Sequence, residues 1–216
     1  MGRQVGQIQV AGKFGGLVGM AGKNGRVYLR AKTQNSPKAP TERQAIVHSR
    51  FKVISELAAQ AKNALKLGLK KKAKQLKCSV YNAFMKLNWD NVRSNMPGVT
   101  TVNYPELIFG VGPVPNVRWS SPQFDEPLTV GLTFTGNVDQ QGADATDKVY
   151  AYAYCPDTGE GLLSEAVSRS ASVISITVPT NWNGMKVHVW GLVIGGENGL
   201  TDRPSESVYI GTGNIG

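Results

Sequence analysis

The spacing of apolar residues changes once along this chain, and the change limits the folds that the chain can adopt. Between Val47 and Leu65 the apolar residues recur at steps of three and four, which is typical of one face of an α-helix. From about Val117 onward they alternate with polar residues, which is typical of β-strands. The sequence therefore predicts an α+β fold, with a helical region before a β-rich region.

Residues 41–96 are assigned to the helical region. Thr41 can cap the first helix, and Gln44 can complete a capping box with it. The apolar stripe of this helix consists of Val47, Phe51, Ile54, Ala58, Ala61 and Leu65. A second helical stretch is predicted over residues 69–92, with apolar residues Ala73, Leu76, Val80, Phe84 and Leu87. Pro97 and Gly98 are expected to stop it.

Residues 110–216 are assigned to a β-sandwich domain that is expected to fold alone. Seven segments alternate with period two: "VRWSSP", "LTVGLTF", "KVYAYAY", "LLSEAV", "SVISITV", "KVHVWGLVI" and "ESVYIG". Turn signals such as "PDTGEG" and "GGENG" separate them. Seven short strands at this spacing favour an immunoglobulin or fibronectin III-like sandwich. A true antibody domain is disfavoured, because the Cys…Trp…Cys pattern is absent.

Residues 1–40 form a glycine-rich, basic N-terminal segment with short strands. "GRVYLRAK" predicts a strand with Val27 and Leu29 on one side and Arg26, Tyr28 and Arg30 on the other. The segment carries seven Lys and Arg, no acidic residue and few large apolar groups, so it can bury little surface by itself. We expect contact with another copy to order it, and Arg26, Tyr28 and Arg30 are candidate subunit contacts.

The net charge of +9 is distributed unevenly. Residues 1–86 contain 18 Lys and Arg against two Glu, whereas residues 110–216 contain five basic and eleven acidic residues. A basic half joined to an acidic half permits head-to-tail contact between copies of the chain.

The lysines of the helical region are the main candidate site. They are Lys62, Lys66, Lys70, Lys71, Lys72, Lys74 and Lys77. No Asp or Glu occurs between Leu57 and Trp89, although an ordinary solvated helix mixes both signs. Three alternatives remain open: a solvated face, a face paired with acidic residues of a neighbouring copy, or contact with a polyanion such as nucleic acid. The run lacks an aromatic residue, which disfavours sequence-specific or single-strand reading.

No motif indicates catalysis, a metal or a cofactor. The two cysteines and two histidines lie far apart, and neither histidine belongs to a recognisable triad motif. The glycine-rich segment matches neither a Walker A loop nor a dinucleotide fingerprint. No secretory signal or membrane span is predicted. We therefore expect a non-enzymatic protein without a metal site, a cofactor or a membrane partner, made and kept soluble in the cytoplasm unless a phage carries it out.

The order of features resembles a family of uncharacterised Bacteroidota proteins of about this length. The resemblance rests on "GKFGGLVGMAGKNGRVYLRAK", "PKAPTERQAIVHSRF", "DKVYAYAYCPDTGEG" and "VPTNWNGMKVHVWGLVIGGENGLTDRPSESVYIG". Its most specific part includes Pro40, Thr41, Glu42, Gln44 and the Arg50–Phe51 pair. The N-terminus also resembles small structural proteins of phages that infect these bacteria. This likeness implies a virion or another assembly component.

Two hypotheses follow. The first is a structural protein that assembles with copies of itself or with other structural subunits, with the virion as its destination if a phage encodes it. The second is a nucleic-acid-associated module that binds through the basic helices without sequence specificity.

Overall fold

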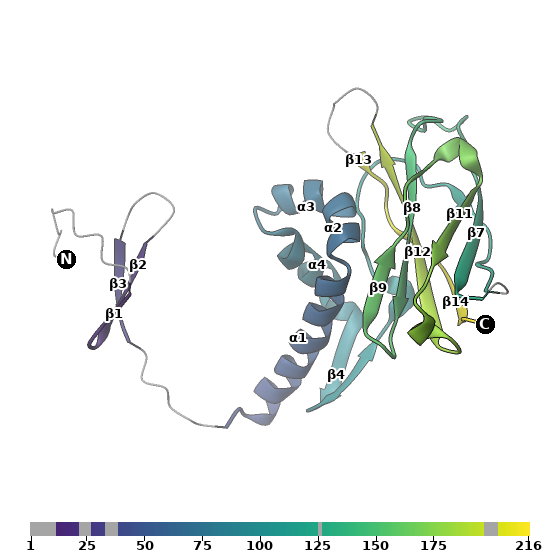
Figure 1. The fold of residues 1–216 in the computed structure, drawn as a ribbon. Helices are drawn as coiled ribbons and strands as arrows, with labels where there is room; N and C mark the ends of the chain where they lie inside the picture. Colours follow the sequence, from purple (N-terminus) through teal and green to yellow (C-terminus); the bar gives the residue numbers. More distant parts are fainter. Residues whose placement is uncertain (1–11, 22–26, 33–38, 125–126, 197–202) are drawn as a thin grey trace. The chain divides into compact units, whose positions relative to one another are not determined.

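The computed structural model of the chain describes residues 12–21, 27–32, 39–124, 127–196 and 203–216 (Figure 1). Contacts divide the chain into two compact units, Met1–Pro40 and Thr41–Gly216. The division falls directly before the first helix, at its capping residue.

The first unit contains a three-stranded antiparallel sheet in the order β1-β2-β3. Its strands are β1 (Gly12–Phe14), β2 (Leu17–Ala21) and β3 (Val27–Ala31). Gly15 has a φ of +51°, which glycine adopts without steric penalty, and the chain reverses there between β1 and β2. Leu17 pairs with Ala31, and Gly19 pairs with Leu29. Directly paired positions share one face of a sheet, so these four residues lie on the same side.

The second unit begins with a helical layer, which Figure 1 shows beside the β-sheets of the same unit. Its α-helices are α1 (Glu42–Gln60), α2 (Lys62–Gly68), α3 (Lys70–Gln75) and α4 (Val80–Asn88). The Thr41 hydroxyl accepts a hydrogen bond from the backbone N–H of Gln44 at 3.4 Å. The side-chain oxygen of Gln44 accepts one from the backbone N–H of Thr41 at 2.9 Å. The predicted capping box is therefore confirmed.

The prediction of one helical stretch over residues 69–92 is wrong. The chain leaves the helical conformation at Lys77, whose φ is +52°, and the N–H of Cys78 donates to the carbonyl of Ala73 at 3.0 Å. This geometry closes a helix C-terminus, where glycine is the usual left-handed residue. Ser79 then caps α4 through its hydroxyl. Because this residue is a lysine and not the usual glycine, the sequence does not indicate that the helix ends here.

The helical region predicted at 41–96 also contains β-structure, which corrects the assignment of its end. After a 3-10 turn, η1 (Trp89–Asn91), the chain forms an antiparallel hairpin of β4 (Val92–Met96) and β5 (Val99–Val102). Pro97 and Gly98 lie between the two strands, and the φ of Gly98 is +79°. These residues were expected to stop a helix, but they reverse a hairpin instead.

Only part of the predicted α1 stripe is buried. Ile54 and Ala58 pack in the core, whereas Val47 and Phe51 are about half-exposed. The earlier turns of α1 lie against the hairpin, where the hydroxyl of Ser49 accepts a hydrogen bond from the backbone N–H of Gly98 at 2.9 Å. The predicted apolar stripe therefore extends, at its N-terminal end, beyond the part of α1 that is buried in the core.

The rest of the second unit is built around two sheets. The larger runs in the order β10-β8-β12-β13, with β9 also paired to β8 and β14 also paired to β12; the smaller runs β11-β7-β6. The strands are β6 (Arg118–Trp119), β7 (Thr129–Thr135), β8 (Lys148–Cys155), β9 (Glu160–Leu163), β10 (Val167–Ser168), β11 (Val173–Thr177), β12 (Lys186–Gly195), β13 (Arg203–Pro204) and β14 (Val208–Asn214). Short 3-10 turns occur at η2 (Tyr104–Glu106), η3 (Arg169–Ala171) and η4 (Thr180–Trp182). Each of the seven predicted segments overlaps at least one strand, and "LLSEAV" spans the end of β9 and the start of β10.

The two sheets enclose one hydrophobic core. Val130 and Leu132 of β7 and Ile174 of β11 come from the smaller sheet. Val187 and Val189 of β12 come from the larger one, and all five side chains are buried. Packing two inward faces in this way gives a β-sandwich.

A second core lies on the other face of the larger sheet. Tyr152 of β8 and Trp190 of β12 pack against Phe109, with ring centroids 5.0 and 4.8 Å away. Phe84 of α4 lies 5.4 Å from Phe109 on the helical side. The helical layer and the sandwich therefore share a core. A fragment of residues 110–216 would lose this cover, which is a physical argument against its folding alone.

A buried ion pair links several loops of the sandwich. Nη2 of Arg169 lies 2.9 Å from Oδ2 of Asp147, and both side chains are buried. Other N–H groups of Arg169 donate to the carbonyl oxygens of Pro115 and Gly136 and to the side-chain oxygen of Asn137. Burying a guanidinium requires partners for its donors, and this environment supplies them.

Gly68 lies where α2 touches the segment that leads into the sandwich. The N–H of Val111 donates to the carbonyl of Gly68 at 3.1 Å. A Cβ at position 68 would overlap the carbonyl oxygen of Phe109 and lie 2.7 Å from Cα of Gly110. Backbone atoms cannot give way as a flexible side chain can, so only glycine fits here without a shift of the helix.

We expect Gly68→Ala to lower the free energy of unfolding by about 1–3 kcal/mol, because overpacking displaces α2 from the sandwich. The measurement is denaturant unfolding followed by tryptophan fluorescence. Asn63→Ala is the matched control, since Asn63 is exposed on the same helix and should change the stability by less than about 1 kcal/mol. Equal stability of the two variants would contradict the close approach.

Candidate functional site

The predicted lysine surface lies on α2, α3 and the turn that follows them. Lys72 is partly buried, and the side chains of the other members are exposed: Lys62, Lys66, Lys70, Lys71, Lys74 and Lys77. The chain bends at Leu69, so the lysines do not follow a single straight helix as their spacing predicts. Leu65, Leu69 and Ala73 turn into the core beneath them. The structure therefore presents the lysines to the outside on two short consecutive helices.

The N-terminal sheet exposes apolar side chains. Leu17 and Leu29 share one face, and their side chains are 47% and 51% exposed. Tyr28 and Arg30 occupy the other face and are also exposed. Of the three residues predicted as subunit contacts, Tyr28 and Arg30 are thus exposed, and Arg26 lies outside the described residues.

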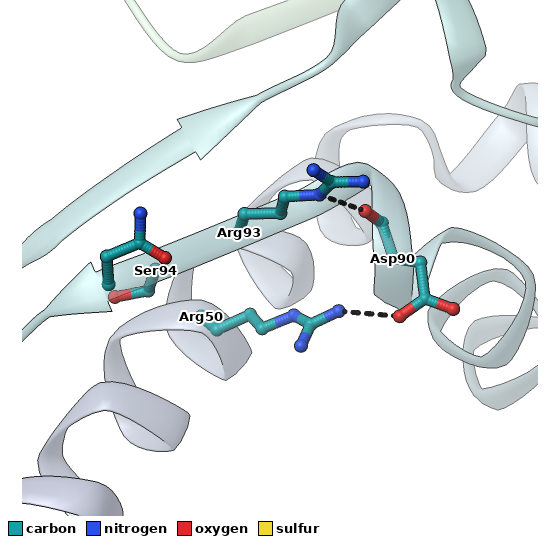
Figure 2. Close-up of a pocket in the computed structure, with 5 residues that line it drawn as sticks. Arg50, Asp90, Arg93 and Ser94 are labelled. Atoms are coloured by element: carbon teal, nitrogen blue, oxygen red, sulfur yellow. Dashed lines mark hydrogen bonds and ion pairs between the residues drawn. The ribbon is translucent and has the colours of Figure 1, made fainter.

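The sequence did not predict a polar hollow between α1 and the β4–β5 hairpin. Its volume is about 280 Å³, and its lining consists of Arg50, Asp90, Arg93, Ser94 and Asn95 (Figure 2). Arg50 comes from α1, while the other residues follow one another through η1 and β4. The pairing of α1 with this hairpin is a long-range contact, so no local pattern marks the hollow.

Arg50 is the most constrained side chain of the hollow. Its guanidinium lies over the ring of Trp89, 4.1 Å from the centroid. Nη2 donates to the Trp89 carbonyl and, at 3.2 Å, to Oδ1 of Asp90. The Arg50 side chain is 19% exposed, whereas that of Asp90 is 95% exposed. Arg50 is therefore held in place by an aromatic ring on one side and by hydrogen bonds at its tip.

Arg93 is held at only one of its nitrogens. Its Nε donates to the backbone carbonyl of Asp90 at 3.3 Å, and Figure 2 shows this bond beside the Arg50–Asp90 pair. Its terminal nitrogens have no acceptor among the described residues. The hydroxyl of Ser94 is occupied within the hairpin, where it donates to the carbonyls of Met96 and Val99. The unused donors of the hollow therefore come from the terminal nitrogens of Arg93 and from Arg50, whose Nε is buried without a hydrogen-bond partner among the described residues.

His188 of β12 has a pKa that differs clearly from the usual value for histidine. Tyr104 stacks on its ring at 4.1 Å between centroids, and Nδ1 lies 2.9 Å from the hydroxyl of Tyr209. Burial, together with a smaller effect of the charge of Lys186, lowers the pKa of His188 to about 4. The imidazole is consequently neutral at pH 7 and serves as a packed member of the aromatic layer.

The His188 environment predicts a pH dependence of stability. The folded pKa of about 4 lies below the unfolded value of about 6.5, so the folded state binds its proton less readily. The contribution is fully present above pH 6.5 and is lost as the pH falls toward 4. We expect His188→Phe to reduce the stability loss across this window by about 2–3 kcal/mol. Denaturant unfolding at several pH values measures it.

His48→Gln is the control for this experiment, because His48 is exposed on α1. Its pH profile should match that of the unaltered chain. A His188→Phe profile with the original slope would show that His188 does not carry the effect.

Within the described residues, no group of three or more His, Cys, Asp or Glu side chains is placed to hold a metal ion. Cys78 and Cys155 are both free thiols. None of the helices described here is long and apolar enough to cross a membrane.

Comparison with known proteins covers most of the chain. A model for a family of unknown function, DUF6266, matches residues 9–211. The chain belongs to this family. The DUF6266 match includes strands of the N-terminal sheet, the helical layer and most of the sandwich. No curated protein matches the chain. Among solved structures, the fn3 domain of the human collagen alpha-1(XX) chain is similar at 18% identity and a TM-score of 0.31, covering 49% of this chain and 86% of that one.

Proposed function

We propose that this DUF6266 protein is a non-enzymatic structural subunit that assembles with copies of itself. The observation that carries the proposal is the exposed apolar face of the N-terminal sheet. A three-stranded sheet is stable in water when an apolar face is covered, and among the described residues Leu17 and Leu29 are exposed on one face of the β1–β3 sheet. A neighbouring subunit would supply the missing cover.

Charge supports a second copy as that neighbour. Residues 1–40 contain seven basic residues and no acidic residue, whereas residues 110–216 carry a net charge of −6. Opposite charges guide association and suppress wrong partners. The N-terminal sheet of one copy would therefore contact the acidic sandwich of the next.

The non-enzymatic part of the proposal rests on the surroundings of the reactive side chains. His188 is stacked on Tyr104 and lies 6.1 Å from the tilted ring of Trp190, and Cys155 is buried beside Met185, with 3.8 Å between the sulfur atoms. Neither side chain is accessible to a substrate.

We further infer that the sandwich is of the immunoglobulin or fibronectin III-like kind, and that the assembly is a phage virion or phage-like particle. The two packed antiparallel sheets support the first inference. The resemblance of the glycine-rich basic N-terminus to small structural phage proteins supports the second. The subunit would then be made in the cytoplasm and carried in the virion.

We expect Leu29→Glu to abolish assembly, because a carboxylate on the apolar face cannot be buried against a neighbour without a partner. Light scattering coupled to size exclusion measures the mass. All four tryptophans lie in Thr41–Gly216, so their fluorescence reports the melting of that unit alone, which should not change. Val47→Glu is the control, since Val47 is exposed on α1, outside the sandwich, and the change of charge is the same. A monomeric unaltered chain, or an assembled Leu29→Glu variant, would contradict the proposal.

The alternative function is binding to nucleic acid through the lysine surface. The exposed lysines on α2 and α3, with no acidic residue from Leu57 to Trp89, favour it. Lysine presents a point charge without the planar fork that reads guanine, so the contact would be to phosphate. Binding would then be insensitive to sequence and would weaken steeply with salt.

Replacing Lys66, Lys71 and Lys74 together with Gln should lower the salt slope of DNA affinity by about 2–3, because up to three phosphate contacts are lost. Fluorescence anisotropy at several salt concentrations measures the slope. The control replaces three exposed lysines elsewhere in the second unit, Lys52, Lys148 and Lys186. If the triple variant forms fewer oligomers but binds DNA with unchanged affinity and salt slope, the lysines pair with a neighbouring subunit. If neither changes, the surface is only solvated.

A further inference from the structure

The side chains that line the hollow between α1 and the hairpin carry a net charge of +1. Arg50 and Arg93 contribute two positive charges, and Asp90 contributes one negative charge. Asp90 is engaged with Arg50 at 3.2 Å. Arg93 has no acidic partner among the described residues. We propose that this hollow binds a carboxylate group, which is a role separate from the assembly proposed above.

The donors are already positioned for such a ligand. The ring of Trp89 and the two hydrogen bonds at Nη2 hold the Arg50 guanidinium, so little side-chain entropy remains to be lost. The bond from Nε to the Asp90 carbonyl orients Arg93. A planar guanidinium can donate two parallel hydrogen bonds to a carboxylate, and the terminal nitrogens of Arg93 are unused for this purpose.

The net charge selects the ligand among oxyanions. A carboxylate brings one negative charge, which balances the excess of one positive charge. A phosphate dianion would bring a second charge next to Asp90, whose carboxylate is almost fully exposed at the rim. Like charges at close range disfavour such an arrangement. The hollow should therefore prefer carboxylates.

The surroundings allow two sources for the carboxylate. Met96 and Val99, at the tip of the same hairpin, are exposed apolar residues. A protein segment that carries an acidic residue beside an apolar one could use both features, whereas a small free carboxylate would use only the arginines. The chemistry at Arg93 is the same in both cases.

The test measures the stabilisation of the full chain by acetate at pH 7. Sodium chloride keeps the ionic strength constant, and tryptophan fluorescence follows the melting. A ligand that binds only the folded state raises the melting temperature saturably. We expect a saturable rise with acetate. Acetamide, which has no charge, should give none.

Variants assign the effect to the hollow. Arg93→Gln should raise the half-saturating acetate concentration roughly tenfold or more, because a charged hydrogen-bond donor is lost. Asp90→Asn should lower it several-fold, because it removes the competing carboxylate. Arg43→Gln is the matched control, since Arg43 is exposed on α1 outside the lining, and it should leave the value unchanged.

The source is distinguished with a short peptide that contains Glu beside Leu. Tighter binding of the peptide than of acetate indicates a protein segment, and equal binding indicates a small free carboxylate; either supports the proposal. Three results overturn it: no saturable rise with acetate, the same half-saturation in Arg93→Gln as in the unaltered chain, or half-saturation by phosphate at a lower concentration than by acetate.

Discussion

The second unit depends on the packing of Phe109 against Tyr152 and Trp190, because this contact joins the helical layer to the sandwich. β12 is consequently buried along both faces from its second residue onward, although antiparallel strands often keep one face in water. The hydroxyl of Tyr152 and the indole nitrogen of Trp190 are buried without a hydrogen-bond partner among the described residues. Burial also raises the pKa of the Tyr152 hydroxyl. The apolar area gained here must outweigh the unmade hydrogen bonds, so the helices form part of the fold and are not an appendage to it.

The two units differ in how far their own residues cover the faces of their sheets. The second unit covers both faces of its larger sheet with its own residues, through one core with the smaller sheet and another with the helices. The N-terminal sheet is a single layer that leaves Leu17 and Leu29 exposed. The described residues thus include a unit whose larger sheet is covered on both faces and a small sheet with two exposed leucines. This contrast gives the assembly proposal a physical basis that sequence charge alone does not provide.

The parts of the fold that depend on local chemistry could be predicted from the sequence. Thr41 and Gln44 lie three residues apart and close their capping box without help from the rest of the chain. The alternation of β7 and β11 reflects the two faces of a sheet in the same direct way, since every second residue of these strands is buried. The end of the helix at Lys77 could not be predicted from the sequence, since a non-glycine residue adopts the left-handed conformation there. The hollow was missed for another reason: Arg50 and Arg93 line the same hollow only because α1 packs on the hairpin, and no local sequence pattern marks either residue.

The buried pair of Arg169 and Asp147 has a consequence for the rate at which the sandwich opens. Pro115, Gly136 and Asn137 bind the same guanidinium, so no one of these loops can detach without leaving a buried charge short of partners. Opening one loop therefore removes an acceptor from a buried charge, which favours the opening of these loops together. Amide hydrogens near these loops would exchange with solvent mainly through concerted opening and would lack the fast local fraying usual for surface loops. The loops that share Arg169 would therefore open together and not one after another.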